Sequence, residues 1–166
     1  MSKPFVAILM GSDSDLPTMQ TTIDVLKKLA VPFEVKITSA HRTPQRTHEY
    51  VKDADQRGCA IFIAAAGLSA HLAGTVAGLT LKPVIGVPME GGPLNGQDAL
   101  LSTVMMPGGI PVATVAIGKA GAKNAAYLAV QIMALSDPDL AQRLAQDREE
   151  NARLIAEKDA ELQKKL

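Results

Sequence analysis

Two short segments of the chain carry residues that could do chemistry together. They are residues 11–15, Gly-Ser-Asp-Ser-Asp, and residues 39–44, Ser-Ala-His-Arg-Thr-Pro. Arginine offers a fixed fork of donors that fits a phosphate or a carboxylate, and histidine can both donate and accept a proton near neutral pH. Each segment follows an apolar run and begins a helix-like pattern, so in an open α/β sheet both would lie at the carboxyl ends of strands. We therefore predict one shared pocket for a small anionic ligand.

The first segment has the residue types of a phosphate-binding turn. Gly11 lets the chain turn sharply and approach a ligand. Ser12 and Ser14 supply hydroxyl groups, and the free N–H groups at the start of a helix add further donors for a phosphate. Asp15 could cap that helix or accept hydrogen bonds from sugar hydroxyls. A capped turn without any ligand is the alternative interpretation.

The second segment and a third strand end supply the candidates for proton transfer and anion binding. His41 and Arg42 are adjacent at the end of an apolar run, and Ser39 precedes them. Residues 64–71, Ala-Ala-Ala-Gly-Leu-Ser-Ala-His, could let a flat ligand lie against the backbone near Gly67. His71 either reaches the pocket or only packs at a helix start, and the sequence leaves both possibilities open.

Apolar runs alternate with helix-length segments along most of the chain. Residues 5–10, 60–66, 84–87 and 112–117 are continuous apolar runs, as expected for strands buried on both faces of a parallel sheet. Residues 33–37 alternate apolar and charged side chains, which indicates a strand near the edge. This order predicts a doubly wound α/β fold, with N-caps at Asp15 and Thr43 for two of its helices.

The C-terminal part of the chain differs in character. Residues 137–139, Asp-Pro-Asp, break the pattern, and the charged, glycine-free segment after them predicts a long helix. We therefore expect a single α/β catalytic domain over residues 1–136 and a helical extension over residues 137–166. That extension would pack on the same subunit or on a neighbouring one.

Composition excludes several function classes. The 17 basic and 17 acidic side chains cancel, so charge gives no argument for binding nucleic acid or an anionic membrane. Cys59 is the only cysteine, and the three histidines lack metal-ligand spacing. There is no glycine-rich dinucleotide fingerprint and no phosphate-loop lysine motif. With no signal peptide or membrane span in the pattern, we expect a cytoplasmic protein whose site needs no metal and no cofactor.

Two loops, residues 88–96 and 106–111, are rich in glycine and proline. Each could be a lid that closes over the pocket or a rigid turn, and the sequence leaves both interpretations open. Lys119 and Lys123 open an apolar helix, where the helix dipole does not favour cations, and the sequence gives them no role.

With these motifs in place, the chain closely resembles the class I N5-carboxyaminoimidazole ribonucleotide mutases of purine biosynthesis. The resemblance runs from about Val6 to Leu135. It rests on the motifs at residues 11–15, 39–44, 70–72 (Ala-His-Leu), 83–88 (Pro-Val-Ile-Gly-Val-Pro) and 106–117 (Met-Pro-Gly-Gly-Ile-Pro-Val-Ala-Thr-Val-Ala-Ile), and residues 121–126 extend it.

The resemblance implies a flavodoxin-like three-layer fold, a homo-octamer, and a reaction without metal or cofactor. The reaction moves a carboxylate from the exocyclic amine of a ribonucleotide's imidazole to ring carbon C4, by release and recapture of carbon dioxide. His41 would be the general acid/base, while Ser12, Asp15 and Arg42 would hold the ribose and phosphate. Ser14, Ser39, Gly67 and His71 are possible secondary site residues.

The chain departs from the family pattern at the third loop and near the fifth strand. Leu68, Ser69 and Ala73 stand where many members have a glycine-rich loop and a proline, and Met105 replaces a glutamine. The nearest alternative is a class II enzyme that carboxylates aminoimidazole ribonucleotide directly with carbon dioxide, but those members tend to have lysine where this chain has Arg42. A non-catalytic flavodoxin-like nucleotide-binding module is the alternative from another functional class.

Overall fold

The computed structural model describes residues 3–166, which form two compact units. One unit ends at Ala129 and contains the sheet, whereas the other runs from Val130 to Leu166. Because the second unit begins inside a helix, we describe each by itself. The expected division at residue 136, and the surface against which the C-terminal extension packs, stay predictions.

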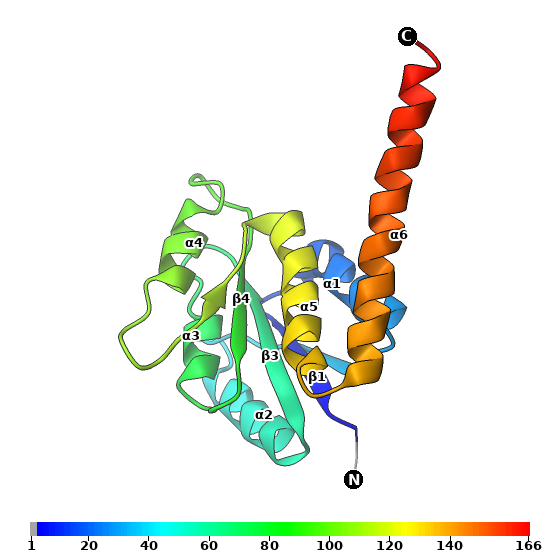
Figure 1. Ribbon diagram of the computed structural model, residues 1–166. Helices are drawn as coiled ribbons and strands as arrows, with labels where there is room; N and C mark the ends of the chain where they lie inside the picture. Colours follow the sequence, from blue (N-terminus) through cyan, green and yellow to red (C-terminus); the bar gives the residue numbers. More distant parts are fainter. Residues whose placement is uncertain (1–2) are drawn as a thin grey trace. The chain divides into compact units, whose positions relative to one another are not determined.

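The first unit is built on five parallel strands in the order β2-β1-β3-β4-β5 (Figure 1). This is the flavodoxin-like strand order, whose switch point lies between β1 and β3 because the chain leaves these two strands in opposite directions. The predicted α/β class and the edge position of the alternating strand are both confirmed. The strands are β1 Phe5–Met10, β2 Phe33–Ile37, β3 Cys59–Ala66, β4 Val84–Pro88 and β5 Ala113–Thr114.

Helices follow the strands and cover both faces of the sheet (Figure 1). The Thr22 hydroxyl of α1 donates to Ala122 O of α5 at 2.7 Å, so these two helices are neighbours. Val51 and Ala54 of α2 belong to one apolar cluster with Leu72 of α3. The helices of this unit are α1 Leu16–Lys28, α2 Pro44–Gln56, α3 Leu72–Ala77, α4 Gln97–Val104 and α5 Gly118–Ala134, the last crossing into the second unit.

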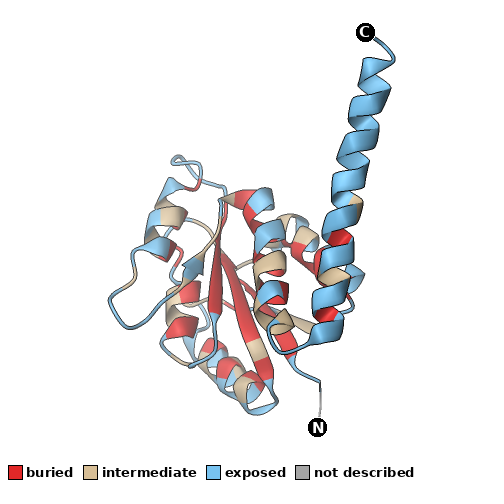
Figure 2. Ribbon diagram, in the orientation of Figure 1, coloured by how far each residue is buried: buried red, intermediate tan, exposed pale blue. Residues whose placement is uncertain are grey.

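The core lies along the central strands. Every residue of β1 and β4 is buried, and β3 is buried except at two positions, as Figure 2 shows in red. A strand buried on both faces cannot shift in register without moving apolar side chains off their neighbours. The sheet therefore holds its carboxyl ends, and the loops that follow them, in fixed positions.

Strand β5 and helix α3 are short, and two helix starts lack side-chain capping hydrogen bonds. β5 pairs with β4 over only Ala113 and Thr114, because it is an edge strand that follows Pro111, which has no N–H to donate. Helix α3 begins only at Leu72 and ends before Gly78, so residues 67–71 are left as a loop. Asp15 and Thr43 occupy the predicted N-cap positions of α1 and α2, but neither side chain makes a capping hydrogen bond.

The second unit is mainly the long helix α6, Pro138–Gln163. The Asp137 side chain caps it by accepting a hydrogen bond from Leu140 N at 3.0 Å. Residues 151–166 are exposed along their whole length. Within residues 3–166, none of the helices combines the length and the apolar character needed to cross a membrane.

Candidate active site

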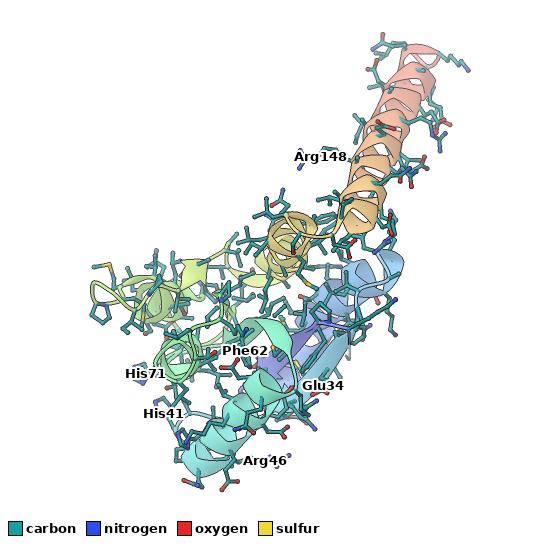
Figure 3. All side chains as sticks on the ribbon, turned by 60° about the horizontal axis from the view of Figure 1, so that its bottom comes forward. Glu34, His41, Arg46, Phe62, His71 and Arg148 are labelled. Atoms are coloured by element: carbon teal, nitrogen blue, oxygen red, sulfur yellow. The ribbon has the colours of Figure 1, made fainter. Side chains whose placement is uncertain are left out.

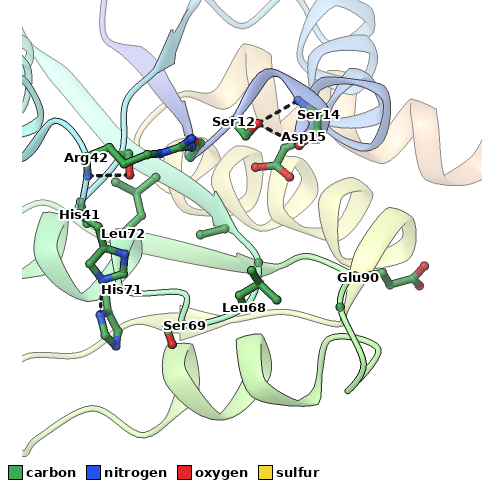
Figure 4. Close-up of a pocket in the computed structure, with 17 residues that line it drawn as sticks. Ser12, Ser14, Asp15, His41, Arg42, Leu68, Ser69, His71, Leu72 and Glu90 are labelled. Atoms are coloured by element: carbon green, nitrogen blue, oxygen red, sulfur yellow. Dashed lines mark hydrogen bonds between the residues drawn. The ribbon is translucent and has the colours of Figure 1, made fainter.

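An open pocket lies at the carboxyl ends of the sheet, where the loops after β1, β2, β3 and β4 come together (Figure 4). Its volume is about 830 Å³, which is in the range of sites for small molecules. The backbone stays paired up to its edge: Gly11 N donates to Ala65 O at 3.1 Å, and Thr38 N donates to Met10 O at 2.8 Å. The pocket therefore has a rigid floor at the topological switch point.

The loop after β1 is organised around the Ser12 hydroxyl. Ser12 caps a single 3-10 turn, residues 13–15, by accepting a hydrogen bond from Ser14 N at 3.3 Å. The Ser14 hydroxyl donates to Ser12 Oγ at 2.9 Å, and Ser12 Oγ donates to Asp13 Oδ1 at 3.1 Å. Both serines line the pocket, so their hydroxyl groups and the start of α1 lie at the same side of it. This arrangement suits an anion such as a phosphate.

Asp15 also lines the pocket, and its carboxyl is half-buried. Burial raises the pKa of Asp15, a backbone hydrogen bond with Ser12 opposes the shift, and repulsion from Asp13 adds to it. A carboxylate that the fold leaves partly desolvated gains most from a ligand that donates hydrogen bonds to it. The position suits the hydroxyl groups of a sugar.

Arg42 connects the first two loops. Its guanidinium donates to Gly11 O at 2.8 Å, and its backbone N–H donates to Ser39 Oγ at 3.1 Å. Among residues 3–166 that guanidinium makes no ion pair with a carboxylate. One hydrogen bond to a carbonyl leaves most of its five donors for another acceptor. The arginine is therefore positioned by the protein but not neutralised by it.

His41 and His71 form a close pair at the wall of the pocket. His41 Nε2 lies 2.7 Å from His71 Nδ1, and the two rings meet edge to face at 4.7 Å between centroids. Figure 3 shows the two labelled histidines side by side, from the loops that precede α2 and α3. One nitrogen of the pair donates and the other accepts, so each ring fixes the tautomer of the other.

A cluster of hydroxyl groups supports the His41-Arg42 loop from behind. The buried hydroxyls of Thr38 and Thr47 lie 2.7 Å apart, and Ser39 N donates to Thr43 Oγ1 at 2.9 Å. Thr43 stands at the N-cap position of α2 without a side-chain capping bond, because its hydroxyl is used inside the loop, where it accepts from Ser39 N and donates to Ser39 O at 3.2 Å.

All the residues that the sequence analysis named as site candidates line this one pocket: Ser12, Ser14, Asp15, Ser39, His41, Arg42, Gly67 and His71. The structure also answers the open question about His71, which reaches the pocket rather than packing inside the fold. The chemical role of each residue stays a prediction. Lys119 and Lys123 do not line the pocket.

Sequence reasoning pointed to the loop of residues 88–96 as a lid or a rigid turn, but it named none of that loop's residues as part of the pocket. Glu90, Gly91 and Gly92 line the pocket opposite the histidines, together with Leu68 from the loop after β3. The available signal was the pair of glycines three residues after the apolar strand β4, because both adopt positive φ angles, +155° at Gly91 and +64° at Gly92. No group of three or more potential metal ligands occurs among the residues that the structure describes.

Comparison with known proteins gives consistent results. Residues 5–154 match the family described as AIR carboxylase. A Synechocystis N5-carboxyaminoimidazole ribonucleotide mutase is 56% identical over 97% of this chain and 90% of its own length. The Bacillus subtilis protein of the same name is 51% identical over 96% of this chain and 99% of its own length. The crystal structure of Treponema denticola PurE superposes with a TM-score of 0.87 at 33% identity, covering 96% of this chain and 99% of that one.

Proposed function

The chain belongs to the AIR carboxylase family, and from this premise we propose that it is a class I N5-carboxyaminoimidazole ribonucleotide mutase of purine biosynthesis. The observation that carries the proposal is the shared pocket: the His41–His71 pair, an arginine without a carboxylate partner and a serine-rich turn face one cavity. Those are the groups that proton transfer on a phosphorylated substrate requires.

The reaction needs little beyond positioning and one proton-transfer group. The bond between the exocyclic nitrogen and the carboxylate carbon breaks, which releases carbon dioxide and returns an electron pair and a proton to the amine. Ring carbon C4 then attacks the carbon dioxide, and C4 loses its proton so that the ring recovers its aromaticity. One proton arrives at nitrogen and one leaves carbon, so the step is balanced without metal or cofactor.

We assign the proton at C4 to His41. Its Nε2 is engaged with His71 Nδ1 at 2.7 Å, so His71 acts as a positioning residue that holds the His41 ring and its tautomer. A positioned histidine can both take and return a proton at neutral pH, which typically contributes about 100- to 10,000-fold to a rate.

The other loops hold the nucleotide in this proposal. Arg42 and the Ser12 hydroxyl bind the phosphate, with Ser14 and the free N–H groups beside it, because these donors converge at the start of α1. Asp15 accepts hydrogen bonds from the ribose hydroxyls. Ser39 fixes the backbone of Arg42, and Gly67 lets the imidazole lie against the strand end without a side chain in the way.

We also propose three features of the enzyme's setting: a homo-octamer, which the family resemblance implies, a cytoplasmic location, and a C-terminal helix that packs within or between subunits, which its sequence pattern indicates. The exposed residues 151–166, which include Leu154, Ile155 and Leu162, are consistent with a helix that a neighbouring subunit covers. Light scattering tests the assembly, since a monomer would contradict it.

A direct comparison of two substrates tests the proposed reaction. Purified protein should convert N5-carboxyaminoimidazole ribonucleotide to the C4-carboxylated isomer, and it should turn over aminoimidazole ribonucleotide with bicarbonate slowly or not at all. Fast carboxylation of aminoimidazole ribonucleotide without conversion of the carbamate would instead establish the class II reaction. Absence of both activities, with tight nucleotide binding, would indicate a non-catalytic module.

A further inference from the structure

Leu68 combines two features that the fold itself does not require. Its backbone adopts φ +54°, in the left-handed region that residues other than glycine rarely occupy. Its side chain is 56% exposed. An apolar side chain usually offsets backbone strain by packing in a core, but this one lies in the wall of the pocket. A glycine at this position would fit the same backbone without strain.

The Leu68 side chain spans the gap between two of the loops that border the pocket. A Cβ atom on Gly92 would lie only 2.6 Å from Leu68 Cδ2, so the leucine rests directly on the backbone of the loop after β4. Met89 N donates to Ala66 O at 2.9 Å, which ties the bases of the same two loops together. In Figure 4, Leu68 lies between the histidine pair and Glu90.

Leu68 also differs chemically from its surroundings in the pocket. The side chains that line the pocket nearby are polar or small, and Leu72, the other large apolar one, is buried with 2% exposure. Leu68 is therefore the large apolar group that the pocket presents to its contents. Such a group excludes water and offers no hydrogen bond.

We propose that Leu68 retains carbon dioxide in the pocket between its release from the amine and its capture at C4, an inference that rests on the proposed function. The intermediate is a small neutral molecule without hydrogen-bond donors, so the protein can hold it only by closing its exits and excluding water. Leu68, supported by Gly92, closes the side of the pocket between the loops after β3 and β4. The backbone strain at Leu68 is then explained by the position that its side chain must reach.

A label-retention experiment tests this role. Substrate with ¹³C in its carboxylate is converted in buffer that contains unlabelled bicarbonate, and the amounts of labelled product and released aminoimidazole ribonucleotide are measured by mass spectrometry. Spontaneous decarboxylation is measured without protein and subtracted. The wild-type protein should keep the label in most turnovers, whereas L68G and L68A should release carbon dioxide several-fold more often for each product molecule formed.

The control variant is L94A, because Leu94 is a similarly exposed leucine, at 54%, in the same stretch as Gly92 but outside the pocket wall. It should retain the label as the wild type does. The ratio of released to captured carbon dioxide does not depend on how much protein is active, so a purely structural defect would not change it. Glycine accepts the backbone angle at position 68, so L68G should stay folded.

Wild-type retention of label in both L68G and L68A would overturn the proposal. Loss of label in L68G alone would also overturn it, because it would assign the effect to backbone freedom rather than to the side chain. Failure of the proposed function looks different: the wild-type protein would then form no product from the carbamate at all.

Discussion

The molecule uses two arginines in opposite ways. Arg57, next to α2, donates from Nη1 and Nη2 to the two carboxylate oxygens of Glu34 at 2.5 and 2.9 Å and from Nε to Asp53 at 2.7 Å. Arg42 lies two residues before α2, and within residues 3–166 its guanidinium makes a single hydrogen bond, to the backbone carbonyl of Gly11. Figure 3 shows Glu34 well away from the two histidines of the pocket.

The contrast separates a structural cluster from a ligand-binding one. Around Arg57 the charged groups are paired within the protein: the arginine lowers the pKa of Glu34, the Tyr50 hydroxyl donates to the same carboxylate at 3.0 Å, and the guanidinium lies over the Phe5 ring. Around Arg42 the protein leaves charge uncompensated and holds Asp15 partly desolvated, with a raised pKa. Groups whose partners are missing in the folded chain are the ones expected to meet a ligand.

The largest expected effect is that of H41N. This variant should lose about 100- to 10,000-fold in turnover, because it removes the proton-transfer group while keeping a polar side chain of similar size. The measurement is the initial rate of carbamate conversion, with circular dichroism to check the fold. H48N is the matched control, since His48 lies in α2 outside the pocket. An H41N protein that keeps most of its rate would remove His41 from the mechanism.

The comparison of the two arginines predicts opposite outcomes for R42A and R57A. R42A should weaken nucleotide binding by about 1.5–3 kcal/mol through loss of charge-assisted hydrogen bonds, and its midpoint of thermal unfolding should hardly change. R57A should leave nucleotide affinity unchanged and lower the unfolding midpoint. Calorimetric titration and thermal melts of both proteins measure these effects. Equal losses of nucleotide affinity in R42A and R57A would contradict a specific role of Arg42 in nucleotide binding.

The Asp15 carboxylate should lower the free energy of unfolding while it strengthens nucleotide binding. Its pKa is raised in the folded state, so the ionised carboxylate destabilises the fold above that pKa, and this cost disappears as the pH falls through it. D15N should therefore raise the free energy of unfolding at pH 7, by less than ~1 kcal/mol because solvent screens a half-exposed group. It should also weaken nucleotide binding. A D15N protein less stable than the wild type at pH 7 would show that the carboxylate has a structural role.

Glu34 should show the reverse pH dependence. Its folded-state pKa is lowered, first by the hydrogen bond from Arg57, so its contribution to stability is complete above the unfolded value of about 4.3 and is lost as the pH falls through the folded-state pKa. Because the Glu34 side chain is 34% exposed and solvent screens the ion pair, the effect should be below ~1 kcal/mol. Urea unfolding of the wild type and E34Q from pH 7 to pH 3 should give curves that converge at low pH. Curves that stay parallel would contradict the assignment.

The sequence predicted most of the architecture because buried strands have an unambiguous pattern. The apolar runs at β1, β3 and β4 and the alternation at β2 each correspond to a strand. The pocket followed from topology, since the loops after parallel strands must meet at one end of the sheet. The position of the motifs at residues 11–15 and 39–44 after two such strands therefore predicts that they share one pocket.

What the sequence did not indicate depends on contacts between distant residues. The 2.7 Å approach of His41 to His71 joins two loops that are 30 residues apart. Thr43 makes no capping hydrogen bond to α2 because its hydroxyl oxygen accepts from Ser39 N instead, which is a matter of local geometry rather than of residue type. The positive φ angle at Leu68 could not be predicted either, because the residue types of a loop do not determine its backbone angles.

The central claim is that the sheet-end cluster binds a ribonucleotide with its imidazole at His41, and a crystal structure with the C4-carboxylated product bound tests it most directly. The account predicts the phosphate at Arg42 and Ser12, and C4 within about 3–3.5 Å of a ring nitrogen of His41. A product whose imidazole lies away from His41, or whose phosphate lies outside the loop after β1, would contradict it.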